Sequence, residues 1–188
     1  MDITHSLNPT TRLGIRFIID THLIDDPSRE MAELREVRRG GWMQLFVSDI
    51  PATELSDAPI GRRDKLLEYA GDYSEYLGPL VVGHSRLDHS VLGSEDDEER
   101  LHQVFSCLFP GGDWFSARRQ DVRDAMNVAT AIRYAMTGFL TKDKRLLRAG
   151  HRIRQAFNGF PILDPSDALA FVRRLQRRHE IRTTNPSD

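Results

Sequence analysis

The pattern of apolar and polar positions predicts strands that alternate with helices. Residues 15–19 form a short, mostly apolar run that leads directly into Asp20, and residues 43–47 form a second run of this kind. Between them, residues 28–39 carry apolar side chains at helical spacing, with a serine available as the N-cap and two glycines after the last turn. A strand, a helix and a second strand joined by short connections indicate a parallel sheet.

The rest of the chain continues this alternation. The expected elements are a short helix at about 51–57, a longer helix at about 61–76, a strand or hairpin within 78–93, helices over 95–108 and about 121–136, strands at 138–141 and 160–163, and a helix over 166–178. Together they predict one three-layer α/β/α domain with a central, mainly parallel sheet over residues 14–180. Residues 1–13 are expected to form a flexible arm, and residues 181–188 a disordered tail.

Length and composition narrow the class of protein. The 188 residues suit a single compact domain. The one cysteine, Cys107, excludes an intramolecular disulfide and a zinc site built from cysteines. Residues 1–13 lack the apolar core of a signal peptide, and no apolar run approaches the roughly 20 residues of a membrane-spanning helix. We therefore expect a cytoplasmic protein with no membrane contact.

Two aspartates stand just past predicted strands. Asp20 follows the strand at 15–19 immediately, and Asp143 follows Thr141, the last residue of a later strand, by two positions. In an open parallel sheet, the carboxyl ends of the strands line the crevice where ligands bind. Two carboxylates at that edge would repel each other, and a hard divalent cation with oxygen ligands would neutralise them.

Two further carboxylates are candidates for the same site. Glu54 lies just past the second strand, and Asp124 lies near the start of the helix that leads into the strand at 138–141. Spacing alone leaves open whether the start of that helix is near the crevice. Asp121 is either the N-cap of the same helix or a supporting residue of the site. Each of the other aspartates has a plain structural alternative: a turn residue for Asp20, a partner of the helix dipole for Asp124 and a surface turn for Asp143.

Four motifs, in order along the chain, resemble the PIN-domain family of ribonucleases. They are the strand and aspartate of residues 18–21, the pair Ser48 and Glu54, the helix start Asp124-Ala125 with the small residues 129–131, and the strand with its Thr-x-Asp over 139–144. The motifs span residues 15–145, about two thirds of the chain. Residues 57–118 have no match in the family pattern, and Thr21-His22 lacks an asparagine often found near that position.

The resemblance implies a metal-dependent endoribonuclease in a PIN-like domain. Asp20, Asp124 and Asp143 would bind Mg²⁺ or Mn²⁺ directly or through water, and Glu54 would bind the metal or orient the attacking water. Thr141 would form a hydrogen bond to a carboxylate or to water. Metal-assisted hydrolysis of RNA would then leave a 5′-phosphate and a 3′-hydroxyl.

Basic residues gather in the second half of the chain, although the formal net charge of the whole chain is −2. Residues 118–154 contain ten Arg or Lys and three Asp. Two interpretations stand, a solvated pair of helices or a surface that binds RNA phosphates next to the acidic site. The candidate RNA-binding residues are Arg118, Arg119, Arg123, Lys142, Lys144 and Arg145.

Other functions stay open on the sequence. A PIN-like domain that binds RNA or a protein partner without cleaving is the first alternative. A phosphatase of the haloacid-dehalogenase type also uses a strand-end aspartate, but it needs a second acid two residues on, where this chain has His22. A toxin paired with an antitoxin protein is one form of the ribonuclease function, and a homodimer is one form of assembly. The sequence decides neither.

Overall fold

The computed structural model describes residues 12–48, 73–76 and 94–184 of the chain. Glu54 lies outside these residues, and so do the predicted helix at 51–57 and the predicted strand or hairpin within 78–93.

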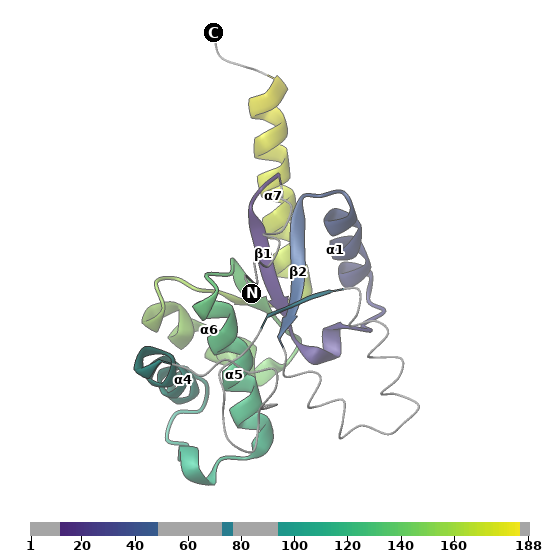
Figure 1. The fold of residues 1–188 in the computed structure, drawn as a ribbon. Coiled ribbons are helices and arrows are strands. Elements are labelled where there is room, and N and C mark those ends of the chain that lie inside the picture. Colours follow the sequence, from purple (N-terminus) through teal and green to yellow (C-terminus); the bar gives the residue numbers. More distant parts are fainter. Residues whose placement is uncertain (1–11, 49–72, 77–93, 185–188) are drawn as a thin grey trace, which may run out of the picture.

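Five parallel strands form the central sheet (Figure 1). They are β1 (Ile15–Ile19), β2 (Met43–Ser48), β3 (Ser74–Tyr76), β4 (Gly138–Leu140) and β5 (Ile162–Leu163). Their order across the sheet is β3-β2-β1-β4-β5, and every neighbouring pair is parallel. The parallel sheet predicted from the sequence is confirmed.

β3 corrects one prediction, which assigned these residues to the end of a helix over 61–76. Ser74, Glu75 and Tyr76 pair with the last three residues of β2. The preceding Tyr73 is buried among the side chains of one face of the sheet. Pairing with an otherwise open strand, together with the burial of Tyr73, outweighs a local preference for helix.

Helices cover both faces of the sheet, which gives the three layers expected from the sequence (Figure 1). One face carries α1 (Arg29–Arg39) and α7 (Pro165–Thr184), and the other carries α4 (Glu95–Leu108), α5 (Arg119–Arg133) and α6 (Lys144–Ala156). Two short 3-10 helices, η1 (Thr21–Leu23) and η2 (Trp114–Ser116), lie in the connections.

β1 runs through the centre of both hydrophobic cores. Phe17 and Ile19 pack with α1 and α7, while Ile18 packs against α4, α5 and α6. All three side chains are fully buried, and each contributes about 1.5–3 kcal/mol of burial free energy. A strand buried on both faces is mostly apolar, and in β1 only Arg16 departs from this, which is why the run is recognisable in the sequence.

α5 begins two residues before its predicted start and ends three residues before its predicted end. Beyond the helix, Ala135 has a positive φ of 47°. Thr137 is fixed to β1, since its backbone N donates to the carbonyl of Arg16 at 2.7 Å and its hydroxyl accepts from Arg16 N at 3.0 Å. The chain therefore has to leave the helix before it enters β4.

The ends of the described domain also differ from expectation. α7 continues to Thr184, so residues 181–184, which we expected in a disordered tail, are helical. At the other end, Arg12 N donates to the carbonyl of Gly41 at 3.1 Å, and the Arg12 guanidinium lies 4.9 Å from the centre of the Trp42 ring. The last part of the predicted arm is thus attached to the domain. In the part of the chain that the structure describes, no helix is both long and apolar enough to cross a membrane.

Candidate functional site

The predicted site lies where the order of the strands reverses. From β1 the chain builds the sheet outward through β2 and β3, and it then returns to place β4 and β5 on the opposite side of β1. The carboxyl ends of β1 and β4 are therefore the switch point at which open parallel sheets form a crevice. Asp20 N donates to the carbonyl of Leu140 at 2.8 Å, so the two strand ends are directly joined.

Asp20 is buried at this edge, with 4% of its surface exposed. The hydroxyl of Thr141 donates to Asp20 Oδ2 at 2.5 Å, and His22 Nε2 lies 3.2 Å from the same oxygen. Asp20 precedes the η1 turn, but its side chain makes no capping hydrogen bond there. The turn-residue alternative therefore does not account for the position of this carboxylate.

Thr141 also organises the strand end that carries Asp143. Its hydroxyl accepts a hydrogen bond from Asp143 N at 2.9 Å while it donates to Asp20. One side chain thus links the loops after β1 and β4. This agrees with the predicted role of Thr141 as a partner of a carboxylate.

Asp143 has a structural role of its own. It is the N-cap of α6, and its Oδ1 accepts from the backbone N of Arg145 at 2.6 Å. Burial acts to raise the pKa of Asp143, but the Arg145 backbone hydrogen bond and guanidinium charge outweigh it, so the pKa lies below its ordinary value. Asp143 is therefore stabilised as a carboxylate even without a ligand.

Asp124 reaches the same edge from α5. A helix that leads into a parallel strand runs back across the sheet, so it starts at the carboxyl ends of the strands, and this answers the question that spacing left open. Asp124 is the sixth residue of α5, beyond the turn where the helix dipole acts, and only 4% of it is exposed. Gln120 Nε2 donates to its Oδ1 at 2.8 Å.

The acidity of Asp124 is strongly reduced. Burial raises its pKa to about 7, with help from the charges of Asp20 and Asp143 and against the effects of Gln120 and Arg145. The Arg145 guanidinium contacts both Asp124 and Asp143, and Thr141 links Asp143 to Asp20, so the three carboxyl groups lie at one edge of the sheet. We call Asp20, Asp124 and Asp143 the carboxylate site.

Asp121 is not the N-cap of α5, and its role as a supporting residue of the site stays a prediction. The N-cap position of α5 belongs to Arg118, and Asp121 lies one turn further on. Arg118 Nε and Nη2 each donate to the Asp121 carboxylate at 2.8 Å, and Arg145 Nη1 lies 3.0 Å from its Oδ1. Burial acts to raise the pKa of Asp121, but the bonds from Arg118 and Arg145 outweigh it and lower the pKa.

Asn127 at this edge was not predicted, and its partner Ser48 was named only as part of a motif. Asn127 lies one turn after Asp124 on α5, and its side-chain oxygen accepts a hydrogen bond from the hydroxyl of Ser48 at the end of β2. Both side chains are buried. The helical spacing of Asp124 and Asn127 was the signal in the sequence that could have identified the pair.

The chemistry of the carboxylate site suits a hard divalent cation, but its geometry does not converge on one point. Within residues 12–48, 73–76 and 94–184, no three Asp, Glu, His or Cys side chains are arranged to hold a metal ion. The Arg145 guanidinium contacts both Asp124 and Asp143, at 3.3 and 3.4 Å. A cation of the protein itself therefore lies against these two carboxylates.

The predicted RNA-binding residues fall into two groups. Arg118, Lys142 and Arg145 form ion pairs with aspartates, and Arg123 is buried in α5, so these four have structural contacts. Arg119 and Lys144 are exposed, as are the side chains of Arg118, Lys142 and Arg145, and Lys144 forms no ion pair with a described aspartate. The basic segment is therefore only partly available to an RNA phosphate.

Lys142 ties together the two loops that form the site. Its Nζ lies 2.6 Å from Oδ2 of the buried Asp26, which belongs to the loop after β1. Burial acts to raise the pKa of Asp26, but the bonds from Lys142 and Ser28 outweigh it and lower the pKa. The pair holds the loops that carry Asp20 and Asp143 beside each other.

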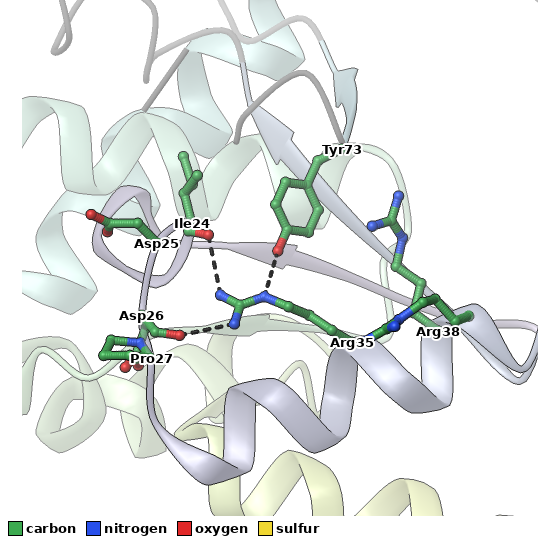
Figure 2. Close-up of a pocket in the computed structure, with 8 residues that line it drawn as sticks. Ile24, Asp25, Asp26, Pro27, Arg35, Arg38 and Tyr73 are labelled. Atoms are coloured by element: carbon green, nitrogen blue, oxygen red, sulfur yellow. Dashed lines mark hydrogen bonds between the residues drawn. The ribbon is translucent and has the colours of Figure 1, made fainter. Parts of the chain in front are cut away.

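A cavity of about 820 Å³ lies beside α1, and neither Asp124 nor Asp143 is among the residues that line it. Figure 2 shows this cavity. Arg35 points across it and donates to the hydroxyl of Tyr73 at 3.0 Å and to the carbonyls of Asp26 and Ile24 at 2.9 and 3.1 Å. These bonds satisfy backbone carbonyls in the loop after β1 and hold that loop against α1. Arg35 thus stabilises the fold next to the site.

Comparison with known proteins adds no assignment. No protein-family model matches the chain, and no curated protein matches it. The resemblance to PIN domains therefore stays a prediction from the motifs.

Proposed function

We propose that this protein is a metal-dependent endoribonuclease that hydrolyses RNA at the carboxylate site. The observation that supports this most is the meeting of three carboxyl groups, two of them buried, at the switch point between β1 and β4. Burying carboxyl groups near one another costs stability, and the pKa of Asp124 near 7 is a measure of that cost. Such a cost at a ligand-binding edge is typical of a functional site.

Asp20, Asp124 and Asp143 would hold Mg²⁺ or Mn²⁺ once Arg145 has moved aside. The ion would polarise the scissile phosphate and make water a better nucleophile at neutral pH. Thr141 keeps Asp20 in place through its hydroxyl. Glu54 lies outside the described residues, and its role as a ligand or as the residue that orients water is part of the proposal.

Single-stranded RNA would reach the site over the start of α6 and α5. Lys144 is the exposed first residue of α6 and directly follows Asp143. Arg119 is the exposed first residue of α5, and Asp124 follows it within the same helix. Phosphate contacts of this kind make binding dependent on salt concentration. A cytoplasmic location, a homodimer and an antitoxin partner belong to the proposal as well.

The second candidate is a protein of this fold that binds RNA or another protein without cleaving. One observation favours it. Asp143 caps α6 and Asp121 is paired with Arg118, so part of the acidic set has a structural explanation that needs no metal ion. The side chains of Asp20 and Asp124 cap no helix among the described residues and are buried, which is why we favour the nuclease.

Cleavage of a mixed RNA pool tests the proposal. Purified protein is incubated with Mn²⁺ or Mg²⁺, with and without EDTA, beside the Asp20→Asn/Asp143→Asn double variant and an Asp167→Asn control on the exposed surface of α7. We expect the wild type and the control to cut RNA only when the metal is present. The double variant should cut at least about 100-fold more slowly, because it has lost two of the carboxylates that would bind the metal. The proposal is contradicted if the double variant still cuts RNA or if the wild type does not cut it.

A further inference from the structure

The Arg145 guanidinium touches three aspartates at once. Its Nη1 lies 3.0 Å from Asp121 Oδ1, and its Nη2 lies 3.3 Å from Asp124 Oδ2 and 3.4 Å from Asp143 Oδ2. Arg145 is the second residue of α6, and its backbone N also donates to Asp143. The side chain therefore extends from the rim of the carboxylate site towards α5.

Arg145 is the cation that Asp124 and Asp143 share. Asp121 has a second cation, because Arg118 donates two hydrogen bonds to it at 2.8 Å. Asp124 has an uncharged donor, Gln120, in addition to Arg145. One positive charge thus serves two carboxylates that a divalent ion would neutralise more completely.

The contacts to Asp124 and Asp143 are long for ion pairs. Charge-assisted hydrogen bonds between nitrogen and oxygen are usually about 2.7–2.9 Å. The side chain of Arg145 is also 43% exposed, and its guanidinium lies 5.9 Å from the centre of the Phe109 ring. It can therefore leave the carboxylates for solvent without a rearrangement of the core.

The same guanidinium stands where a metal ion would contact Asp124 and Asp143. Carboxylate oxygens bind Mg²⁺ at about 2.0–2.1 Å, so ligands of one ion have to approach a common point. Asp124 and Asp143 are instead bridged by a planar group of several atoms. The ion and Arg145 compete for the same two carboxylates.

We infer that Arg145 is a built-in counter-ion of the carboxylate site, and that a divalent cation binds only as the guanidinium leaves. This inference rests on the proposed function for the nature of the ion. It goes further by naming a positioning residue that keeps the metal-free site neutralised and limits its affinity for metal.

Calorimetric titration with Mn²⁺ in the absence of RNA tests this. The variants are Arg145→Gln, Arg145→Lys and, as a matched control, Arg148→Gln. Arg148 is exposed one turn further along α6 and forms no ion pair within the part of the chain that the structure describes, so its loss changes the net charge equally. Thermal unfolding without metal checks that each variant is folded.

We expect Arg145→Gln to bind Mn²⁺ at least tenfold more tightly than the wild type, since the competing cation is gone. Arg145→Lys should fall between them, because it keeps the charge but cannot bridge two carboxylates. Arg148→Gln should match the wild type. Destabilisation alone would lower the affinity, so a gain separates competition from a merely structural role.

Two results would overturn the inference, and they are distinguishable. Equal or weaker binding by Arg145→Gln, with wild-type binding that Asp124→Asn abolishes, would leave the metal site standing and remove the role of Arg145. No Mn²⁺ binding by any folded variant would remove both this inference and the metal site of the proposed function.

Discussion

Asp124 carries its carboxyl group into a buried position beside two other carboxyl groups. Its pKa near 7 means that at neutral pH a bound proton or a nearby cation is needed to offset the repulsion between the carboxylates. Asp20 shares the burial and accepts from the Thr141 hydroxyl, as Asp124 accepts from Gln120. At the level of single residues, then, the site is held together by a few directed hydrogen bonds that act against charge repulsion.

Asp124→Asn should remove a dependence of stability on pH. An unfolded aspartate titrates near pH 3.9, whereas folded Asp124 titrates at about 7. Between these values the folded state keeps a proton that the unfolded state has released. Asp124 therefore lowers the free energy of unfolding as pH rises from about 4 to about 7, by at most about 1.4 kcal/mol per pH unit.

The lowered pKa values of Asp26, Asp121 and Asp143 do not interfere with this test. Their stabilisation is complete above the ordinary aspartate pKa and is lost only as pH falls through their lower folded values. Urea unfolding of metal-free protein at pH 5, 6 and 7 measures how steeply the free energy of unfolding changes with pH. An equal slope in wild type and Asp124→Asn would show that Asp124 is already charged at pH 5.

Thr141→Val should lower the free energy of unfolding by roughly 1–3 kcal/mol, because it removes a donor to buried Asp20 and leaves Asp143 N–H without its acceptor. Thr130→Val is the matched control. Thr130 is equally buried, but its hydroxyl donates only to the carbonyl of Met126 within α5. Urea unfolding compares the two. The Thr141 contacts are unimportant if both variants lose the same stability.

At the level of elements, the sequence predicted the strand that is buried on both faces and missed the strand that forms only by pairing with a neighbour. Phe17 to Ile19 could only be a buried strand, and the run was recognised. β3 was not, because its three residues become a strand only through their partner β2. Arg145 was expected at an RNA phosphate, since nothing in the sequence shows that its side chain lies against Asp121 and Asp124.

Two glycines in neighbouring elements should respond in opposite directions to alanine. In β4, a Cβ at Gly138 would lie 3.0 Å from both Pro161 Cγ and the Pro161 carbonyl oxygen, so Gly138→Ala should cost about 1–3 kcal/mol. In α6, a Cβ at Gly150 would meet Ile162 Cβ at 3.5 Å, an ordinary contact. Gly150→Ala should therefore gain about 0.5–1 kcal/mol from helix propensity.

Thermal and urea unfolding of the two alanine variants measure these differences. A neutral Gly138→Ala would mean that β5 can move away from β4 without loss. A destabilising Gly150→Ala would mean that α6 packs more tightly on β5 than the contact distances show.

At the level of the whole molecule, the site depends on the topology of the sheet. Asp20 and Asp143 are far apart in the chain and become neighbours because β1 and β4 are adjacent and parallel. The motifs predicted this edge of the sheet and implied that Asp124 belongs to it, but the spacing along the chain alone could not show that α5 starts there. Glu54 lies outside the described residues, so its membership of the site stays a prediction.

The location of the site also predicts where RNA binds. α7 follows β5 and runs back along the sheet, so its C-terminal half lies away from the carboxyl ends of the strands (Figure 1). Arg177 and Arg178 are exposed in that half of the helix. Lys144→Gln should weaken binding of single-stranded RNA and reduce the salt slope by about one. Arg177→Gln, which removes the same charge, should change neither. Fluorescence anisotropy in EDTA at several salt concentrations measures the affinity for RNA and its salt slope. Equal effects of the two substitutions would indicate electrostatic attraction to the whole surface instead of binding near Lys144.

The most direct test of the account is the chemistry of the cut ends. A short single-stranded RNA that the protein cleaves is incubated with Mn²⁺, and its products are analysed by mass spectrometry beside an EDTA reaction. Hydrolysis at a metal-binding carboxylate site predicts 5′-phosphate and 3′-hydroxyl ends that form only in the presence of the metal. Products that end in a 2′,3′-cyclic phosphate, or any that form equally well in EDTA, would contradict it.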